Sequence, residues 1–345
     1  MFIFGPMFTQ FKDKIRLLKK INAYRWVNLF KLFLSYSYSR FSRTPRIWGL
    51  PYAIAFEPTT TCNLKCPECP SGLRKFTRPT GNADFSLFEN TIKQNHKHAF
   101  YLTLYFQGEP LINRDFYKMV RAAKQKKFYV STSSNAHFFT KENAIKTVES
   151  GLDKLIISLD GLTQKTYSKY RIEGTLQKVL DGIDNLVKAK NDLRSATPNI
   201  IIQFLVFSHN EHEIKLVKKL KKQLGVDAVK IKSAQFYNPD NSELIPQDEN
   251  LTRYRKNKSG SFAIKNKIVN RCWRLWSSPV ITQDGQVLPC CFDKDAEHSL
   301  GKLNGDSFTN IWNDNDYNDF RKQVFTDRSK IDICRNCSEG SKVWL

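Results

Sequence analysis

Short apolar runs alternate with helical patterns through the middle of this chain, and this alternation is the strongest constraint on its fold. Six such runs lie at Tyr52–Glu57, Phe100–Phe106, Phe128–Thr132, Lys154–Leu159, Ile200–Val206 and Ala228–Lys232. Helical periodicity fills the intervals over 84–97, 114–126, 140–150, 175–190 and 211–223. Repeated β-then-α units form a parallel sheet with right-handed crossovers. The sequence therefore predicts an α/β fold, open or curled into a partial barrel, with its chemistry at the carboxyl ends of the strands.

The remaining segments divide around this core. A chain of 345 residues suits about two domains. Residues 236–271 are polar and basic and contain a flexible Ser-Gly-Ser sequence, which predicts a connection. A hairpin with an Asp-Gly turn follows over Val280–Leu288, and a short helix is expected around Phe308–Phe325. We therefore expect an appendage over 1–50, a core over 51–235, the connection, and a small α+β domain over 272–345.

Residues 1–50 are basic and periodically apolar. They carry ten basic residues and a single acid, Asp13. Leu29, Phe30 and Phe33 recur there at helical spacing. Two interpretations stay open. The helix lies in an acidic membrane interface, or its apolar stripe packs on the main body and its basic residues stay in water. The longest apolar candidate, Trp26–Tyr38, is too short to span a bilayer, because a span needs roughly 20 residues.

The overall charge points to anionic partners without choosing among them. The formal net charge is +22 at pH 7, which favours nucleic acid, an acidic membrane surface or a phosphorylated substrate. Hydrophobic residues make up 41% and charged residues 26% of the chain, so a disordered protein is excluded.

The eight cysteines fall into two groups, with none between positions 70 and 271. A secreted disulfide scaffold spreads its cysteines through a shorter chain that follows a signal peptide. The start, Met1–Phe8, lacks a basic lead and a small-residue cleavage site. Cysteines grouped in this way indicate metal binding or catalysis rather than disulfides. Free thiols persist in a reducing compartment, so we expect a cytoplasmic protein.

The first cysteine group directly follows the first predicted strand. Cys62, Cys66 and Cys69 have the spacing C-x3-C-x2-C, which suits one metal site or one cluster. Three ligands are one short of the usual four for a closed cubane or a structural zinc. One iron would therefore stay open to a small molecule, whereas the alternative is a zinc site.

This motif after the first strand of a βα series resembles the signature of radical S-adenosylmethionine (SAM) enzymes. The resemblance implies a [4Fe-4S] cluster whose open iron binds the amino and carboxylate groups of SAM. It also implies a low-potential electron donor, reductive cleavage of SAM to a 5′-deoxyadenosyl radical, and hydrogen abstraction from a substrate.

Further segments are similar to the SAM-binding motifs of that family. By resemblance, the residues after the second strand contact the SAM amino group, and those at the third to fifth strands approach its ribose and carboxylate. These residues are Gly108, Glu109, Pro110, Ser133, Ser134, Asn135, Ser158, Asp160, Arg171 and, with a weaker match, Gln203. One departure is Glu68, which occupies a position before the third cysteine that is often aromatic in the family and shapes the adenine site.

The second cysteine group resembles the SPASM or "twitch" extension of radical SAM proteins. Cys272 precedes the predicted hairpin, Cys290 follows it, and Cys334 and Cys337 form a C-x2-C pair near the end. The resemblance implies a fully ligated auxiliary [4Fe-4S] cluster. The spacing also permits a zinc ribbon, and the neighbouring Cys291 is an alternative to Cys290 as ligand.

Together, the two resemblances imply a partial (β/α)6 barrel of radical SAM type with a small C-terminal α+β iron–sulfur domain. The function they imply is a radical SAM oxidoreductase that oxidises a small molecule or glycan. The auxiliary cluster would accept an electron or anchor the substrate, and the sequence does not identify a catalytic base. A peptide or protein maturase is the alternative within the superfamily. The alternative outside the enzyme class is a zinc-stabilised nucleic-acid-binding protein. If the chain is the enzyme, no nucleic acid is expected as its partner.

Overall fold

The computed structural model describes residues 5–237, 239, 243–265 and 267–338, without the side chains of residues 5–10. Its main feature is an eight-stranded sheet in the order β10-β9-β1-β2-β3-β4-β5-β6. All six predicted strands are confirmed, and they pair in parallel in chain order. They are β1 (Ala53–Phe56), β2 (Tyr101–Thr103), β3 (Tyr129–Ser134), β4 (Lys154–Ser158), β5 (Asn199–Val206) and β6 (Ala228–Ser233).

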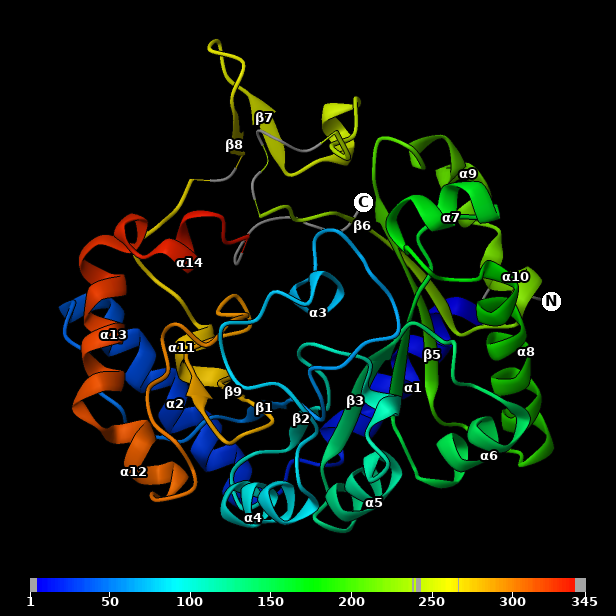
Figure 1. The fold of residues 1–345 in the computed structure, drawn as a ribbon. Helices are drawn as coiled ribbons and strands as arrows, with labels where there is room; N and C mark the ends of the chain where they lie inside the picture. The colour runs from blue at the N-terminus through cyan, green and yellow to red at the C-terminus, as the bar shows by residue number, and fades with distance from the viewer. Residues whose placement is uncertain (1–4, 238, 240–242, 266, 339–345) are drawn as a thin grey trace.

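Helices line the outer side of this curved sheet (Figure 1). The predicted helices are confirmed as α4 (Phe85–Asn95), α5 (Phe116–Gln125), α6 (Lys141–Glu149) and α8 (Leu176–Asp192), and α7 (Gln164–Tyr170) was not predicted. The continuous helix expected over 211–223 is wrong. That segment is broken into a 3-10 turn (Glu211–Glu213), α9 (Ile214–Val217) and α10 (Leu220–Leu224). Lysines four positions apart, such as Lys218 and Lys222, repel each other along a continuous helix.

The two faces of the sheet differ in burial. Leu155, Ile157, Ile200 and Ile202 are fully buried beneath the helices. Ile156, Gln203 and Leu205 point to the other side of the sheet, inside the barrel, and keep partial exposure. This alternation follows from the period of two along a strand, and it leaves an accessible inner face for a site.

The C-terminal hairpin extends the same sheet. β9 (Val280–Ile281) pairs in parallel with β1, and β10 (Val287–Leu288) returns antiparallel to β9. Gly285 of the predicted Asp-Gly turn has a φ of +90°, which a glycine adopts without steric cost. The hairpin thereby places the second cysteine group beside the strand that leads to the first group.

The other C-terminal elements are short. They are α11 (Arg274–Ser277), α12 (Phe308–Asn313), α13 (Asn315–Asp327) and α14 (Asp332–Arg335). The single helix expected around 308–325 is wrong, because Asp314 is extended and caps α13 with its side chain. The expected connection over 236–271 contains a separate hairpin of β7 (Tyr254–Lys256) and β8 (Phe262–Ile264).

The appendage forms two helices, α1 (Gly5–Leu18) and α2 (Ala23–Ser42). Both lie behind the sheet, away from the short α3 (Pro70–Leu73) at the front (Figure 1). Among the described residues, none of the helices is both long enough and apolar enough to cross a bilayer.

A buried ion pair joins the segments around β1. Arg78 donates two hydrogen bonds of 2.7 Å to the carboxylate of Glu57, and both side chains are almost fully buried. Glu57 also accepts from the backbone N–H of Gln283, and Arg78 donates to the carbonyl of Lys294. Burial raises the pKa of Glu57, and the neighbouring guanidinium opposes that rise. This ion pair therefore connects the end of β1, the loop after α3, the turn of the C-terminal hairpin and the segment that follows the hairpin.

Replacing Arg78 with methionine is expected to lower the free energy of unfolding by about 3–5 kcal/mol, because Glu57 is left as an uncompensated buried charge. The double variant Glu57→Gln/Arg78→Met is expected to recover a substantial part of that loss. Urea unfolding of the anaerobically reconstituted protein measures both. Equal stabilities of wild type and Arg78→Met would contradict a connecting role for the pair.

Candidate functional site

The first cysteine group lies in a loop between β1 and α3. Cys62, Cys66 and Cys69 pack against one small core cluster, with Cys66 buried and the other two half-buried. Burial raises the pKa of Cys62 to about 12, and the nearby Cys66 and Cys69 add to that rise through charge repulsion. The three thiols are therefore close electrostatic neighbours.

Glycines allow two loops to approach this group closely. A Cβ at Gly72 in α3 would lie 2.5 Å from the backbone nitrogen of Cys66. Gly108 has a φ of +70°, and a Cβ there would lie 2.3 Å from the carbonyl oxygen of Thr59. The loop after β2 is thus held directly against the segment that leads to Cys62.

Glu109 follows Gly108 and is almost completely buried. Its backbone N–H donates to the carbonyl of Thr61. Its carboxylate accepts from the Ser134 hydroxyl at 2.8 Å and from the Asn135 N–H at 2.7 Å. Burial raises the pKa of Glu109 to about 7, and these hydrogen bonds oppose the rise. The Gly-Glu-Pro and Ser-Ser-Asn segments predicted from the sequence therefore meet at one carboxylate.

Asn135 continues this network toward the cysteines. Its side-chain amide donates to the Oδ1 of Asn63 at 2.8 Å and lies 3.9 Å from the Sγ of Cys62. Gln107, next to the Gly-Glu-Pro segment, lies 3.9 Å from the Sγ of Cys69. Polar side chains from two strand ends thus surround the loop.

Arg171 brings a positive charge to Cys66, the second cysteine of the group. Its Nη1 lies 3.6 Å from the Sγ of Cys66, and its Nε donates to Asp160 at 2.7 Å. The other carboxylate oxygen of Asp160 accepts from the Leu205 N–H at 2.7 Å. Asp160 is fully buried, and both of its oxygens are occupied by protein donors. Because the Leu205 N–H holds the Asp160 carboxylate in place, Asp160 fixes the orientation of the Arg171 side chain.

Three further predicted residues share the inner face of the barrel. Ser158 and Gln203 are register partners on β4 and β5, so their side chains point to the same side. Ser133 lies opposite Ile156, two residues before Ser158, and therefore faces the same way. The structure thus brings Gly108, Glu109, Asn135 and Arg171 against the first cysteine loop, and it places Ser133, Ser158 and Gln203 on the same inner face of the sheet.

The second cysteine group lines one small cavity. Cys272, Cys290, Cys334 and Cys337 all contribute to its wall, together with Arg328. Arg328 donates to the Sγ of Cys337 at 3.0 Å and to the carbonyl of Arg271 at 3.0 Å. Four thiols around one small cavity, with Arg274 and Arg328 in its wall, form a donor set that suits a fully ligated iron–sulfur cluster.

Cys291 lies outside this wall. It packs against a separate small cluster that contains Val280 and Leu288. Burial lowers the pKa of Lys232 and that of Lys294, and the nearby Cys291 opposes both shifts. Of the two adjacent cysteines, the geometry favours Cys290 as the ligand. Within the described residues, no three cysteine, histidine or carboxylate side chains gather closely enough for a single metal ion.

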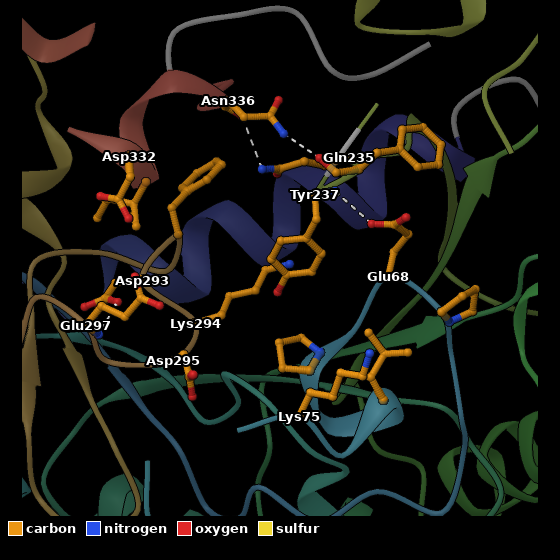
Figure 2. Close-up of a pocket in the computed structure, with 16 residues that line it drawn as sticks. Glu68, Lys75, Gln235, Tyr237, Asp293, Lys294, Asp295, Glu297, Asp332 and Asn336 are labelled. Atoms are coloured by element: carbon orange, nitrogen blue, oxygen red, sulfur yellow. Dashed lines mark hydrogen bonds between the residues drawn. The ribbon is translucent and has the colours of Figure 1, made fainter. Parts of the chain in front are cut away.

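A cavity of about 570 Å³ (Figure 2) is lined by neighbours in sequence of both cysteine groups, so it lies between them. Pro67, Glu68 and Pro70 form one side of it. The opposite side consists of Phe292, Asp293, Lys294, Asp295 and Glu297, with Asp332, Ile333 and Asn336. Its size is typical of a site for a small ligand.

Glu68 and Tyr237 connect the walls of this cavity. Glu68 accepts a hydrogen bond of 2.8 Å from the Tyr237 N–H (Figure 2). The Nζ of Lys294 lies 4.1 Å from the centre of the Tyr237 ring. Sequence reasoning missed Tyr237 and Lys294, because neither belongs to a motif and only the fold of the C-terminal segment brings them to the cavity.

Comparison with protein families identifies the class. Residues 56–220 match the radical SAM superfamily, and residues 272–338 match SPASM, an iron–sulfur cluster-binding domain. The chain belongs to the radical SAM superfamily and carries a C-terminal SPASM domain. It is a radical SAM enzyme with a SAM-binding [4Fe-4S] cluster and an auxiliary iron–sulfur cluster. The zinc-stabilised nucleic-acid-binding alternative is therefore wrong.

The chain is also similar to named proteins. It is 24% identical over 314 residues to a tungsten-containing aldehyde ferredoxin oxidoreductase cofactor-modifying protein of Pyrococcus furiosus, covering 82% of this chain and 86% of that protein. It is 27% identical over 179 residues to an AdoMet-dependent heme synthase of Methanosarcina barkeri, covering 52% and 49%.

Among solved structures, Streptococcus suis SuiB bound to S-adenosylmethionine has a TM-score of 0.61 at 14% identity, covering 85% of this chain and 73% of that chain. BtrN in complex with AdoMet and 2-DOIA has a TM-score of 0.51 at 18% identity, covering 84% and 93%. At such low identity, these likenesses confirm the fold, a parallel sheet of radical SAM type.

The two adjacent cysteines provide a matched test of the auxiliary site. Cys290→Ala is expected to lose about half of the iron and sulfide of the wild type, since one of two clusters loses a ligand. Cys291→Ala is expected to keep the full content. Iron and sulfide analysis of anaerobically purified proteins measures both. Loss in Cys291→Ala and retention in Cys290→Ala would reverse the assignment.

Proposed function

We propose that this radical SAM enzyme oxidises a small molecule, such as a sugar or another alcohol, in the cavity between the two cysteine groups. The position of this cavity carries the proposal. A ligand of sugar size bound there touches the first cysteine loop on one side and the segment after Cys290 on the other. The names of the two relatives, which refer to cofactor modification and heme synthesis, also support a small-molecule substrate.

The charges of the cavity favour a neutral or amine-bearing substrate over a phosphorylated one. Five carboxylates line it against two lysines, although the whole chain has a net charge of +22. An excess of negative charge in a partly enclosed space attracts cations and repels phosphate esters. The excess of basic residues in the chain therefore lies outside this cavity, where only Lys75 and Lys294 contribute positive charge.

We assign the predicted residues to roles that agree with this geometry. Cys62, Cys66 and Cys69 would hold the catalytic cluster, and Cys272, Cys290, Cys334 and Cys337 the auxiliary one. Glu109 presents a carboxylate that Ser134 and Asn135 hold in place, suitable for the SAM amino group. Arg171, oriented by Asp160, supplies a positive charge beside Cys66. The domain boundaries expected from the sequence stay a prediction.

When bound, the catalytic cluster and SAM supply a carbon radical that takes a hydrogen atom from the substrate. Conversion of a carbinol to a carbonyl then requires the loss of one more electron and one proton. An auxiliary cluster held by Cys272, Cys290, Cys334 and Cys337 would supply an electron acceptor near the cavity, and the proton needs a basic side chain in the cavity.

Lys294 is the best-placed group to accept this proton. Its Nζ points into the cavity toward Tyr237 (Figure 2). Burial lowers the pKa of Lys294, which brings its neutral, basic form closer to neutral pH. Its backbone is fixed by the hydrogen bond from Arg78 to its carbonyl, so the amine is held at the cavity wall.

A series of sugars that differ only in charge tests the substrate class. Glucosamine, glucose and glucose 6-phosphate are each incubated anaerobically with enzyme, SAM and dithionite, and 5′-deoxyadenosine is measured. The acid-lined cavity predicts the greatest acceleration by the amine and the least by the phosphate ester. Cys66→Ala is the inactive control.

The opposite order, with the phosphate ester most effective, would contradict the electrostatic argument. Acceleration by short peptides but by none of the sugars would favour the peptide-maturase alternative. SuiB bound to its precursor peptide and anSMEcpe with a bound peptide show that chains of this fold also accept peptides.

Replacing Lys294 with glutamine separates proton removal from hydrogen abstraction. We expect SAM cleavage to persist and the yield of oxidised product per 5′-deoxyadenosine to fall by about 100-fold, the usual contribution of a general base. Lys75→Gln, at the other lysine of the cavity, is the matched control. Product yields are measured with the most effective sugar by mass spectrometry. An unchanged yield in Lys294→Gln would exclude this role.

A further inference from the structure

The helix α2 is packed with its polar side inward. Its buried residues are Arg25, Asn28, Leu32, Ser35 and Ser39. A surface helix normally buries an apolar stripe and keeps polar residues in water. The expectation that the apolar stripe packs on the main body is therefore wrong for this helix.

Hydrogen bonds to backbone groups explain the reversed orientation. Arg25 donates to the carbonyls of Lys20, His96, Lys126 and Lys127. These contacts cap the ends of α4 and α5, whose last carbonyls have no partner within their own helices. The amide of Asn28 exchanges two hydrogen bonds with the backbone of Leu50, at 2.7 and 2.9 Å. Specific polar contacts thus fix which side of α2 faces the protein.

The opposite side of α2 is aromatic and exposed. Among the described residues, eighteen large apolar side chains are strongly exposed, and eleven of them lie between positions 11 and 48. We call these eleven the aromatic face: Phe11, Leu18, Tyr24, Trp26, Val27, Phe30, Phe33, Leu34, Tyr38, Phe41 and Trp48. Phe30 is 63% exposed and Phe41 is 91% exposed. Apolar side chains concentrated in this way mark an interaction surface.

Positive charge surrounds the aromatic face. Lys14, Lys19, Lys31, Arg40 and Arg46 are exposed in the same segment. The only acid of residues 1–50 is Asp13, which is buried and hydrogen-bonded to Tyr129. Residues 1–50 therefore contribute no exposed carboxylate that would offset these charges.

A basic hollow adjoins the C-terminal end of α2. It is lined by Arg40, Arg43, Lys267, Ile268, Val269, Asn270 and Arg271, with four positive side chains and no carboxylate. Such a hollow suits a phosphate group next to an apolar surface.

We propose that the aromatic face and the basic hollow dock this enzyme on the surface of an anionic phospholipid membrane. Tryptophan, tyrosine and phenylalanine with flanking lysine and arginine are the residues of helices that lie in the membrane interface. A second copy of the chain fits less well, because symmetric pairing through this face would oppose two basic surfaces.

The helices that carry the aromatic face contact the amino ends of the strands, opposite the SAM-binding residues, whereas the basic hollow lies closer to the auxiliary site, since Arg271 precedes Cys272. Asp13 bonds to Tyr129 and Lys154, the first residues of β3 and β4. The cysteines and the predicted SAM-binding residues follow the carboxyl ends of the strands. On the membrane, the cavity between the cysteine groups would face away from the lipid, so the enzyme would act on substrates from the aqueous side.

Vesicle flotation of the full-length, reconstituted protein tests the proposal. Binding is expected to vesicles of mixed phosphatidylcholine and phosphatidylglycerol, with little binding to phosphatidylcholine alone and a decrease as salt rises. The triple variant Trp26→Ser/Phe30→Ser/Phe33→Ser is expected to reduce the bound fraction at least about tenfold. Ile145→Ser/Leu193→Ser/Leu216→Ser removes three exposed apolar residues elsewhere and is expected to bind as the wild type does.

A second pair of variants tests the charges. Arg40→Gln/Lys267→Gln is expected to weaken binding by about fivefold for each charge removed, whereas Lys218→Gln/Lys222→Gln leaves it nearly unchanged. All variants are expected to cleave SAM at the wild-type rate, which verifies their fold and separates this proposal from the proposed function. Equal flotation of the aromatic variant and its control would overturn the proposal. So would a dimer in solution that the aromatic variant dissociates.

Discussion

The buried ion pair of Glu57 and Arg78 is the interaction on which the arrangement of the two cysteine groups depends. It joins the end of β1, the loop after the first cysteine group, the turn of the C-terminal hairpin and the backbone of Lys294. A charged pair without solvent is stable only when its hydrogen bonds are satisfied, so it requires all these segments at once. The hairpin pairs with β1 in the same place, and the SPASM segment thereby becomes a continuation of the barrel sheet.

This continuity explains how one cavity can serve two clusters. The first cysteine loop leaves the carboxyl end of β1, and the segment after Cys290 returns across the barrel to the same region. Because Glu68 holds the backbone of Tyr237, and Tyr237 covers Lys294, the two walls are connected through direct contacts. Site residues from distant parts of the sequence therefore form one structural unit.

Charge is divided between the two ends of the barrel. The cavity is lined mainly by carboxylates, whereas the far end carries the exposed lysines and arginines of the appendage. A net charge of +22 would, on composition alone, suggest an anionic substrate. The appendage has ten basic residues and one acid, so it contributes 10 − 1 = +9 of this charge, and it lies on the proposed docking surface rather than at the cavity.

The sequence by itself determined the parallel βα core, the C-x3-C-x2-C loop, the Gly-Glu-Pro and Ser-Ser-Asn segments and the grouping of the cysteines, because strand periodicity and ligand spacing are local properties. Only the tertiary structure decided that Cys290 and not Cys291 lines the auxiliary cavity, since two adjacent residues differ only in the direction of their side chains. It also decided that Lys294 reaches the cavity and that α2 turns its aromatic side outward. Both depend on backbone partners far away in the chain, such as the carbonyls that bind Arg25, and no local pattern encodes those contacts.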